Sequence, residues 1–223
     1  MIDSPSDGVG VPVSIPSEHG LLYGELALLP NSPGIIVLLQ ADIALDKEDQ
    51  LLARLFQLAG FSTLSTNLSA HYGNHSLDIH TDVHSMTQGL LGFLDLIKKR
   101  KRMGEIDEQR IGLFANNEAS PVAVRIGALR DRDIAAIVCY KGLVDLAGAI
   151  YLHSLASLLL FLTEEIDTPQ TASNRRALKE ITCHTELRII PEIKSDDMTT
   201  SSTLEFRFSE AAHWFNRYLA IRE

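Results

Sequence analysis

The sequence predicts an α/β fold, a three-layer α/β/α sandwich in which helices cover both faces of a mostly parallel sheet. Two observations lead to this prediction. Apolar runs of strand length alternate with segments whose apolar residues recur at helical spacing, an order that favours parallel strands joined by helices. The run at 35–39 is continuously apolar, as expected of a strand covered on both faces. With 223 residues, 45% of them hydrophobic, the chain can form one domain with a sizeable core.

The predicted elements follow in order along the chain. Residues 1–19, rich in Ser, Pro and Gly, are interpreted as an extended N-terminal segment, and residues 20–223 as a single domain. Strands are predicted at 21–29, 35–39, 61–68, 110–115, 134–140, 157–162 and 186–193. Helices are predicted at 46–59, in a segment ending near residue 99, directly after the strand at 110–115, at 172–181 and at 204–221. The strand at 35–39 is expected at the centre of the sheet.

Charge and hydropathy exclude several partners. A formal net charge of −9 argues against binding nucleic acid or an anionic membrane, because both attract basic faces. The basic run at 98–102 is interpreted as a solvated helix end that suits the helix dipole. The apolar run at 155–162 is too short to span a bilayer, and no signal-peptide pattern is present, so a cytoplasmic location is expected. Cys139 and Cys183 lack a CxxC spacing and are expected to be reduced.

The stretch 110–124 predicts a strand, a sharp turn and a helix in immediate succession. This is the shape of a nucleophile elbow, whose motif is Gly-x-Ser-x-Gly. Here Ala115 and Ala119 keep the flanking positions small, and Asn117 stands at the apex. Asparagine tolerates a positive φ better than most residues with a side chain. The sequence therefore predicts an elbow whose geometry is kept and whose nucleophile is missing.

This order of elements, together with five short phrases, resembles the α/β-hydrolase fold and, within it, the small dienelactone-hydrolase-like proteins. The phrases lie at 58–64, 111–115, 144–148, 174–178 and 212–215. The resemblance covers nearly the whole chain from about residue 20, and the order of the phrases carries it rather than any single one. It implies a three-layer sandwich and, in relatives, hydrolysis of an ester or a lactone.

The resemblance also implies where a catalytic triad would lie. The nucleophile position falls on Asn117, and the acid position falls best on Asp167, with Glu164 and Glu165 close enough to compete. Relatives carry the histidine after the last strand in a phrase like Pro-Gly-x-x-His, where this chain has Pro-Glu-Ile-Lys-Ser ending at Ser195. The triad is therefore expected to be degenerate.

The oxyanion-hole loop departs from the pattern as well. Relatives often carry His-Gly or Gly-Gly after the corresponding strand, whereas this chain has Gln-Ala-Asp-Ile at 40–43, with a carboxylate where negative charge would develop. An asparagine amide is neither nucleophile nor base. Neither Ser120, placed along the predicted helix, nor Cys139, placed in a predicted strand, is expected to replace the nucleophile.

Four histidines lie close together at His71, His75, His80 and His84, with aspartates between them. The last two are four residues apart at the start of a predicted helix and share one face, as a zinc or nickel pair would. A polar surface loop followed by a helix start is the competing interpretation. A third is pH-dependent charging of the cleft rim, because imidazole titrates near neutrality.

The leading hypothesis is a non-catalytic protein that binds a small molecule or a partner at a cleft lined by Gln40, Ala41, Asn117 and Glu118. The ligand or partner is not identified by any motif. The alternative is a hydrolase of esters or lactones with relocated or metal-assisted catalytic groups, which bound metal would distinguish. A structural subunit with a filled cleft is a third hypothesis, and a homodimer is an expectation that no residue pattern supports.

Overall fold

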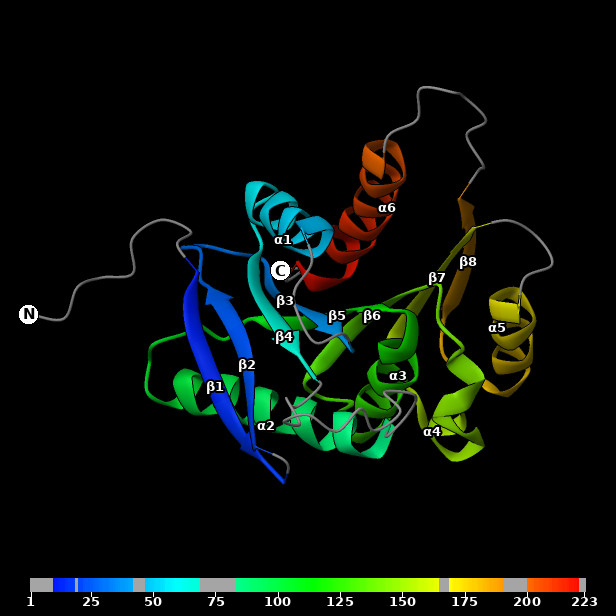
Figure 1. Cartoon of the computed structure of the whole chain (residues 1–223), viewed down its shortest axis with the longest axis horizontal. Coiled ribbons are helices and arrows are strands. Elements are labelled where there is room, and N and C mark those ends of the chain that lie inside the picture. The colour runs from blue at the N-terminus through cyan, green and yellow to red at the C-terminus, as the bar shows by residue number, and fades with distance from the viewer. Residues whose placement is uncertain are drawn as a thin grey trace, which may run out of the picture.

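One mixed sheet forms the centre of the molecule (Figure 1), in which the described strands have the order β1-β2-β4-β3-β5-β6-β7-β8. This computed structural model describes residues 10–18, 20–41, 47–68, 83–164, 169–190 and 200–220. The strands are β1 (Val11–Ser17), β2 (Gly20–Ala27), β3 (Gly34–Gln40), β4 (Ser62–Asn67), β5 (Arg110–Asn116), β6 (Ile134–Tyr140), β7 (Leu158–Glu164) and β8 (Thr185–Ile190). All neighbours from β4 to β8 pair in parallel, and β2 is antiparallel to both β1 and β4. The prediction of a mostly parallel sheet is confirmed.

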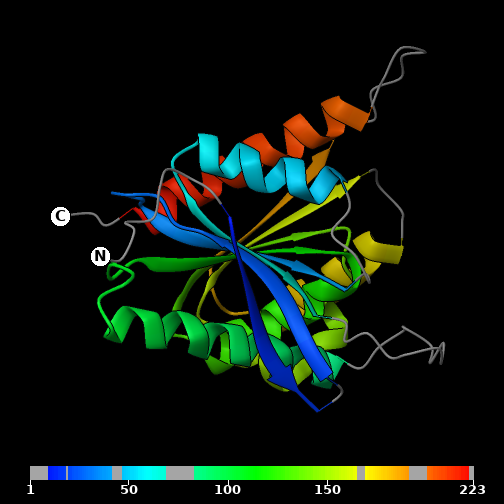
Figure 2. The same cartoon turned by 60° about the vertical axis from the view of Figure 1, so that its left-hand side comes forward.

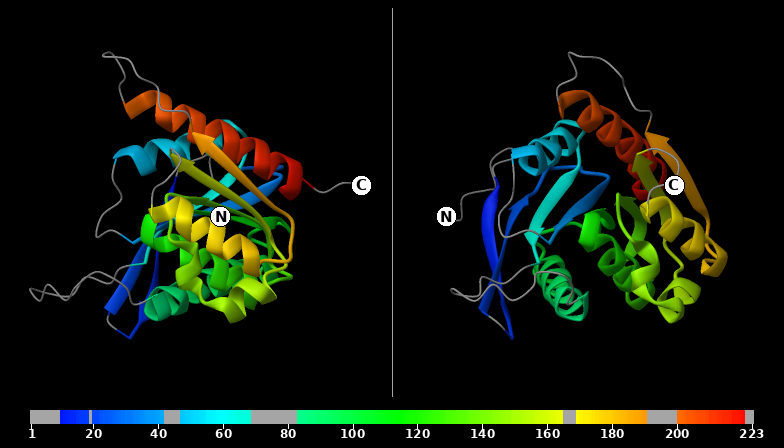
Figure 3. Two further views of the ribbon diagram at one scale, coloured as in Figure 1. Left: turned by 90° about the vertical axis from the view of Figure 1, so that its right-hand side faces the viewer. Right: turned by 45° about the vertical axis from the view of Figure 1, so that its right-hand side comes forward.

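Helices cover both faces of this sheet, as Figures 2 and 3 show. They are α1 (Lys47–Leu58), α2 (Val83–Arg102), α3 (Ser120–Leu129), α4 (Ala149–Ser154), α5 (Pro169–Glu180) and α6 (Thr200–Leu219), with short 3₁₀ turns η1 (Asn117–Ala119) and η2 (Val144–Ala147). Buried residues of α1 and α6 belong to one core, and those of α2 to α5 belong to the core on the opposite face. The predicted three-layer sandwich is confirmed.

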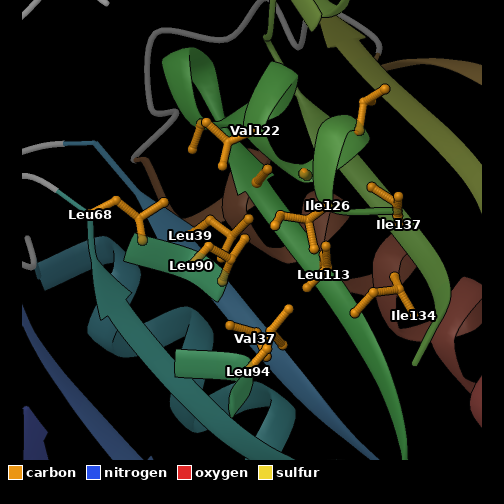
Figure 4. Packing of buried hydrophobic residues seen from close by; sticks show 14 of the residues in the cluster. Val37, Leu39, Leu68, Leu90, Leu94, Leu113, Val122, Ile126, Ile134 and Ile137 are labelled. Atoms are coloured by element: carbon orange, nitrogen blue, oxygen red, sulfur yellow. The ribbon is translucent and has the colours of Figure 1, made fainter. Parts of the chain in front are cut away.

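Strand β3 explains why a continuous apolar run indicates a central strand. Every residue of β3 is buried. Successive side chains of a strand point to opposite faces, so Val37 and Leu39 belong to the core under α2 and α3, whereas Leu38 belongs to the core under α1 and α6. Figure 4 shows Val37 and Leu39 close to Leu90 and Leu94 of α2. Both faces need apolar side chains, which removes the polar-apolar alternation.

An aromatic cluster holds α1 and α6 against the sheet. The centroid of the Phe56 ring on α1 lies 5.3–6.3 Å from the ring centroids of four other residues, all in edge-on geometry. These are Phe61, Phe114, Phe208 and Phe215. Phe208 and Phe215 lie on α6 and Phe114 on β5. Edge-on pairs add about 0.5–1.5 kcal/mol beyond the burial of their area. Two helices far apart in the sequence are thereby fixed on one face.

Two features at the N-terminal side of the sheet differ from simple expectation. Strand β1 lies inside the segment predicted to be an extended lead-in and pairs with β2, so the sheet begins before residue 20. Strand β4 is polar except for Leu64, yet the residues from Ser62 to Thr66 are buried. Its hydroxyls are satisfied internally: Thr66 donates to the Leu38 carbonyl at 3.1 Å, and Ser62 accepts from the Leu29 amide at 3.0 Å. Hydrogen bonding to the backbone therefore allows polar residues in a covered strand.

A polar junction joins η2 to α5. The Asp145 carboxylate of η2 accepts hydrogen bonds from the Ser173 hydroxyl and, at 2.5 Å, from Arg176 Nε, both on α5. Burial raises the pKa of Asp145, but these hydrogen bonds and the charge of Arg176 outweigh it and hold the pKa below its usual value. The connection that follows β6 is thus anchored by a charged side chain.

Candidate functional site

The elbow predicted from the sequence is present at the carboxyl end of β5. Strand β5 ends at Asn116, η1 occupies the next three residues, and α3 starts at Ser120. Asn117 has a φ of 43°, in the left-handed region that few residues with a side chain adopt. The flanking Ala115 and Ala119 are both fully buried. The backbone of a nucleophile elbow is therefore formed here with an amide side chain at its apex.

Gly142, in the connection after β6, packs against this elbow. A Cβ at Gly142 would lie 2.9 Å from the Asn117 carbonyl oxygen and 2.0 Å from the Ser120 side chain. Only glycine allows such a close approach without movement of the elbow backbone. Gly142 could not be identified from the sequence, because nothing local to residues 141–143 indicates which turn packs against them.

Ser120 and Cys139, which were not expected to replace the nucleophile, are both buried. Ser120 is fully buried, with its hydroxyl 3.5 Å from the Ala115 carbonyl. Cys139 is buried on β6 with its sulfur 3.8 Å from the Ser120 carbonyl, and burial raises the pKa of its thiol to about 12. Both Cys139 and Cys183 are free, as expected from their spacing. A protonated, buried thiol is a poor nucleophile.

Three amide side chains gather where β3 and β5 end. Leu39 pairs with Ala115 in register, so Gln40 and Asn116 leave adjacent strands at neighbouring positions on the same face. Asn117 follows directly and is exposed, as is Glu118. Gln40 and Asn117 were predicted from the sequence to line this site, whereas Asn116 was not.

The Gln40 side chain is unusual in its surroundings. Gln40 is 4% exposed, and both its side-chain nitrogen and its side-chain oxygen are without a hydrogen-bond partner among the described residues. Its neighbour Asn116 donates to Asp49 of α1 at 3.0 Å, but the Asn116 side-chain oxygen has no such partner. Buried polar atoms are nearly always paired in folded proteins. These unpaired amide atoms therefore mark the face beside the elbow as a place where a polar group would be stabilised.

A charged network covers the same face. Arg207 of α6 is 4% exposed, and its guanidinium pairs with Glu48 of α1. The guanidinium carbon also lies 4.4 Å from the centre of the Tyr140 ring, at the end of β6. Burying a cation is tolerable only when a partner compensates its charge. The pair with Glu48 and the contact with Tyr140 thus fix α1, α6 and β6 relative to one another beside the elbow.

Several predicted site residues lie outside the described part of the chain. These are the acid position Asp167, the histidine position Ser195, and the cluster residues His71, His75 and His80. His84 is described and lies exposed in the first turn of α2. Within the described ranges, no three histidine, cysteine or acidic side chains are grouped so as to hold a metal ion. The zinc or nickel site and the degenerate triad thus stay predictions.

Two cavities between the described residues, of about 480 and 630 Å³, lie at the edge of the sheet opposite the elbow, among residues that start β5, β6 and β7. The chain segments that follow the carboxyl ends of β3, β4, β7 and β8 lie outside the described residues. They are 42–46, 69–82, 165–168 and 191–199. The cleft expected over Asn117 would lie at that edge, and it stays a prediction.

Comparison with solved structures identifies the fold. No family model matches the chain, and no curated protein sequence matches it. A dienelactone hydrolase from Anabaena variabilis superposes with a TM-score of 0.81 at 23% identity, covering 96% of this chain and 99% of its own. The esterase Pf2001 of Pyrococcus furiosus gives 0.71 at 15% identity, covering 95% of this chain and 94% of its own. Est1E from Butyrivibrio proteoclasticus gives 0.68 at 10% identity, covering 92% and 99%.

These similarities confirm the predicted α/β-hydrolase fold over nearly the whole chain, and the dienelactone hydrolase among them agrees with the resemblance noted in the sequence. At such identities the comparison concerns architecture rather than chemistry. None of the described helices is long and apolar enough to cross a membrane.

Proposed function

We propose that this α/β-hydrolase-fold protein binds a small polar ligand at the carboxyl edge of its sheet and does not hydrolyse esters or lactones. The observation that carries the proposal is Asn117, an amide at the apex of a formed elbow with a φ of 43°. In the architecture that the chain shares, this position presents the nucleophile. Keeping the strained turn while changing its apex favours a role in binding.

The chemistry of the apex supports this proposal. A triad hydroxyl attacks only after an imidazole accepts its proton, and a carboxamide can neither attack nor take part in that transfer. Loss of the nucleophile in a triad enzyme lowers turnover by about 10⁶-fold, and what remains comes from binding and the oxyanion hole. Ester hydrolysis at this elbow is therefore expected to be negligible.

The amides provide a basis for recognition. Each carboxamide offers two donor hydrogens and an acceptor oxygen, and the atoms of Gln40 and one atom of Asn116 lack partners among the described residues. A ligand with hydroxyl or carbonyl groups could satisfy them at the same edge as the exposed Asn117. Bound ligand would stabilise the protein by about 2.7 kcal/mol at a concentration one hundred times its dissociation constant.

Catalysis is tested by comparing the wild type with Asn117→Ala. We expect no covalent labelling of either protein by a fluorophosphonate probe, and equal background rates with p-nitrophenyl acetate and a dienelactone. Saturable hydrolysis that Asn117→Ala removes would overturn the proposal. Hydrolysis that persists in Asn117→Ala and is abolished by a chelator would instead favour the metal-assisted alternative at the histidine cluster.

Binding is tested by thermal shift with a panel of small hydroxy acids, lactones and amides. A ligand of the elbow should raise the melting temperature of the wild type and have a weaker effect on Gln40→Met, which keeps side-chain length and removes the amide. Equal shifts in both proteins would place the ligand elsewhere. The expected homodimer is a separate proposal, which sedimentation equilibrium tests.

A further inference from the structure

The amino edge of the sheet carries a groove that the proposed function does not use. The two cavities of about 480 and 630 Å³ share Arg110, Asp131, Ile134 and Ala135, so they adjoin at the starts of β5 and β6. The C-terminal end of α2 contributes to the larger cavity and that of α6 to the smaller one. Figure 2 shows these two helix ends at the same edge, on opposite faces of the sheet. We call the two cavities together the amino-edge groove.

The groove reverses the charge balance of the chain. Acidic residues outnumber Lys and Arg by 29 to 20 in the whole sequence. The described lining of the amino-edge groove instead contains three acidic residues and six cationic ones, Lys98, Lys101, Arg102, Arg110, Arg132 and Arg217. A hollow lined by one sign of charge concentrates field and attracts ions of the opposite sign.

Much of this positive charge is not compensated within the groove. Lys98, Arg102 and Arg132 have no ionic partner in the part of the chain that the structure describes. Of the acidic side chains, Asp133 lies 3.5 Å from Arg130, which does not line the groove, and Glu108 is 92% exposed. Ion pairs between solvent-exposed side chains contribute little to stability.

Lys101 is a partly buried cation of the groove. Its side chain is 14% exposed; the amine donates to the Gln109 carbonyl and lies 3.9 Å from Glu108. Burial lowers the pKa of Lys101 more than Glu108 and Asp133 raise it. An anion placed against the amine would replace the water that burial has removed.

A second feature of the lining is an unpaired amide. The side-chain oxygen of Gln109 is buried and has no hydrogen-bond partner among the described residues. Gln109 lines the larger cavity beside Lys101 and Arg110. A polar atom in this position would be satisfied by a ligand group that can donate a hydrogen bond.

We propose that the amino-edge groove binds a small polyanion, a molecule with two or more phosphate or carboxylate groups and at least one hydroxyl. Each of its two cavities has a volume within the range of about 300–1,000 Å³ of ligand pockets. Guanidinium groups bind both kinds of oxyanion through paired hydrogen bonds. A nucleic acid polymer is disfavoured, because the chain carries a net charge of −9.

This site is independent of the elbow. Arg110 begins β5 and Asn116 ends it, and at about 3.3 Å per residue the two edges are roughly 20 Å apart. Absence of a ligand at the elbow would leave the amino-edge groove unaffected.

The proposal is tested by isothermal titration calorimetry at low salt with pyrophosphate and, separately, citrate. The groove variant combines Lys98→Gln on α2 with Arg132→Gln just before β6. Both cations are exposed and line the larger cavity. Its matched control is Lys179→Gln with Arg54→Gln, which removes the same charges from exposed positions on α5 and α1. Circular dichroism melts verify that both variants remain folded.

We expect saturable binding of at least one probe to the wild type and to the control, weakened about fivefold in the groove variant. The stronger of the two probes tells whether phosphate or carboxylate is the preferred group. Absence of binding by both probes, or equal affinity for the groove variant and the wild type, would overturn the proposal. Tighter binding of a single-stranded oligonucleotide than of either probe would overturn it in favour of a polymer.

Discussion

Gln40 offers a direct test of the site beside the elbow. The residue is 4% exposed, and neither polar atom of its side chain has a partner among the described residues. The perturbation is Gln40→Met, which keeps an unbranched side chain of similar length in the same space and removes both polar atoms.

The magnitude follows from the cost of burying an unpaired polar group, about 1–3 kcal/mol. Methionine removes that cost and adds apolar contact in a position bordered by buried residues of β3, so the free energy of unfolding should rise by about 1–3 kcal/mol. For a chain of this length the melting temperature should rise by about 2–4 °C per kcal/mol. A stabilising substitution that removes binding is typical of functional sites.

Urea unfolding followed by tryptophan fluorescence measures this change, because the single tryptophan, Trp214, is 2% exposed on α6. The midpoint should rise with an unchanged slope. The matched control is Thr66→Val on β4, a buried residue whose hydroxyl is paired with the Leu38 carbonyl at 3.1 Å. Losing that hydrogen bond should cost about 0.5–1.5 kcal/mol. If Gln40→Met destabilises the protein as much as Thr66→Val does, the Gln40 amide is paired in the folded protein and the reasoning fails.

Three further predictions concern the elbow and its surroundings. Gly142→Ala should destabilise the protein by about 1–3 kcal/mol, because its Cβ would lie 2.0 Å from the Ser120 side chain; chemical denaturation measures this, and a neutral result would contradict the packing. Because the pKa of Asp145 is lowered in the folded state, its contribution to stability is present above its unfolded value near 3.9 and is lost as pH falls through the folded pKa. Asp145→Asn should therefore lose less stability than the wild type when urea unfolding is compared at pH 6 and pH 3, and parallel losses would contradict the shift. Cys139, whose thiol pKa is raised to about 12, should react with Ellman's reagent at pH 8 only after unfolding, whereas the half-buried Cys183 should react first; two equally fast thiols would argue against the buried assignment.

The order of elements and the elbow could be predicted because both depend on local physics. The continuous apolar run of β3 indicates a strand covered on both faces wherever it lies in the chain. The turn at Asn117 is likewise a property of a few consecutive residues, because small flanks and a tolerance of positive φ are intrinsic to those residue types. Strand β1 escaped prediction because its pairing with β2 is not visible in its composition.

The surroundings of the elbow were decided only by the tertiary structure. Arg207 meets Glu48 across 159 positions of sequence, and Asn116 meets Asp49 across 67. No local pattern selects such partners, since they are chosen by which helices pack on which face of the sheet. Gly142 is required only because its turn passes against Asn117.

The sequence by itself thus determined the α/β sandwich, the elbow and the amide at its apex. The tertiary structure decided that Gln40 and Asn116 would lie side by side, with amide atoms that have no partner among the described residues. It also decided that cations from α2, α6 and the starts of β5 and β6 would share one groove. The reason is that side-chain types and short-range periodicity are encoded locally, whereas the pairing or isolation of a buried polar group depends on strands and helices that are distant in the chain.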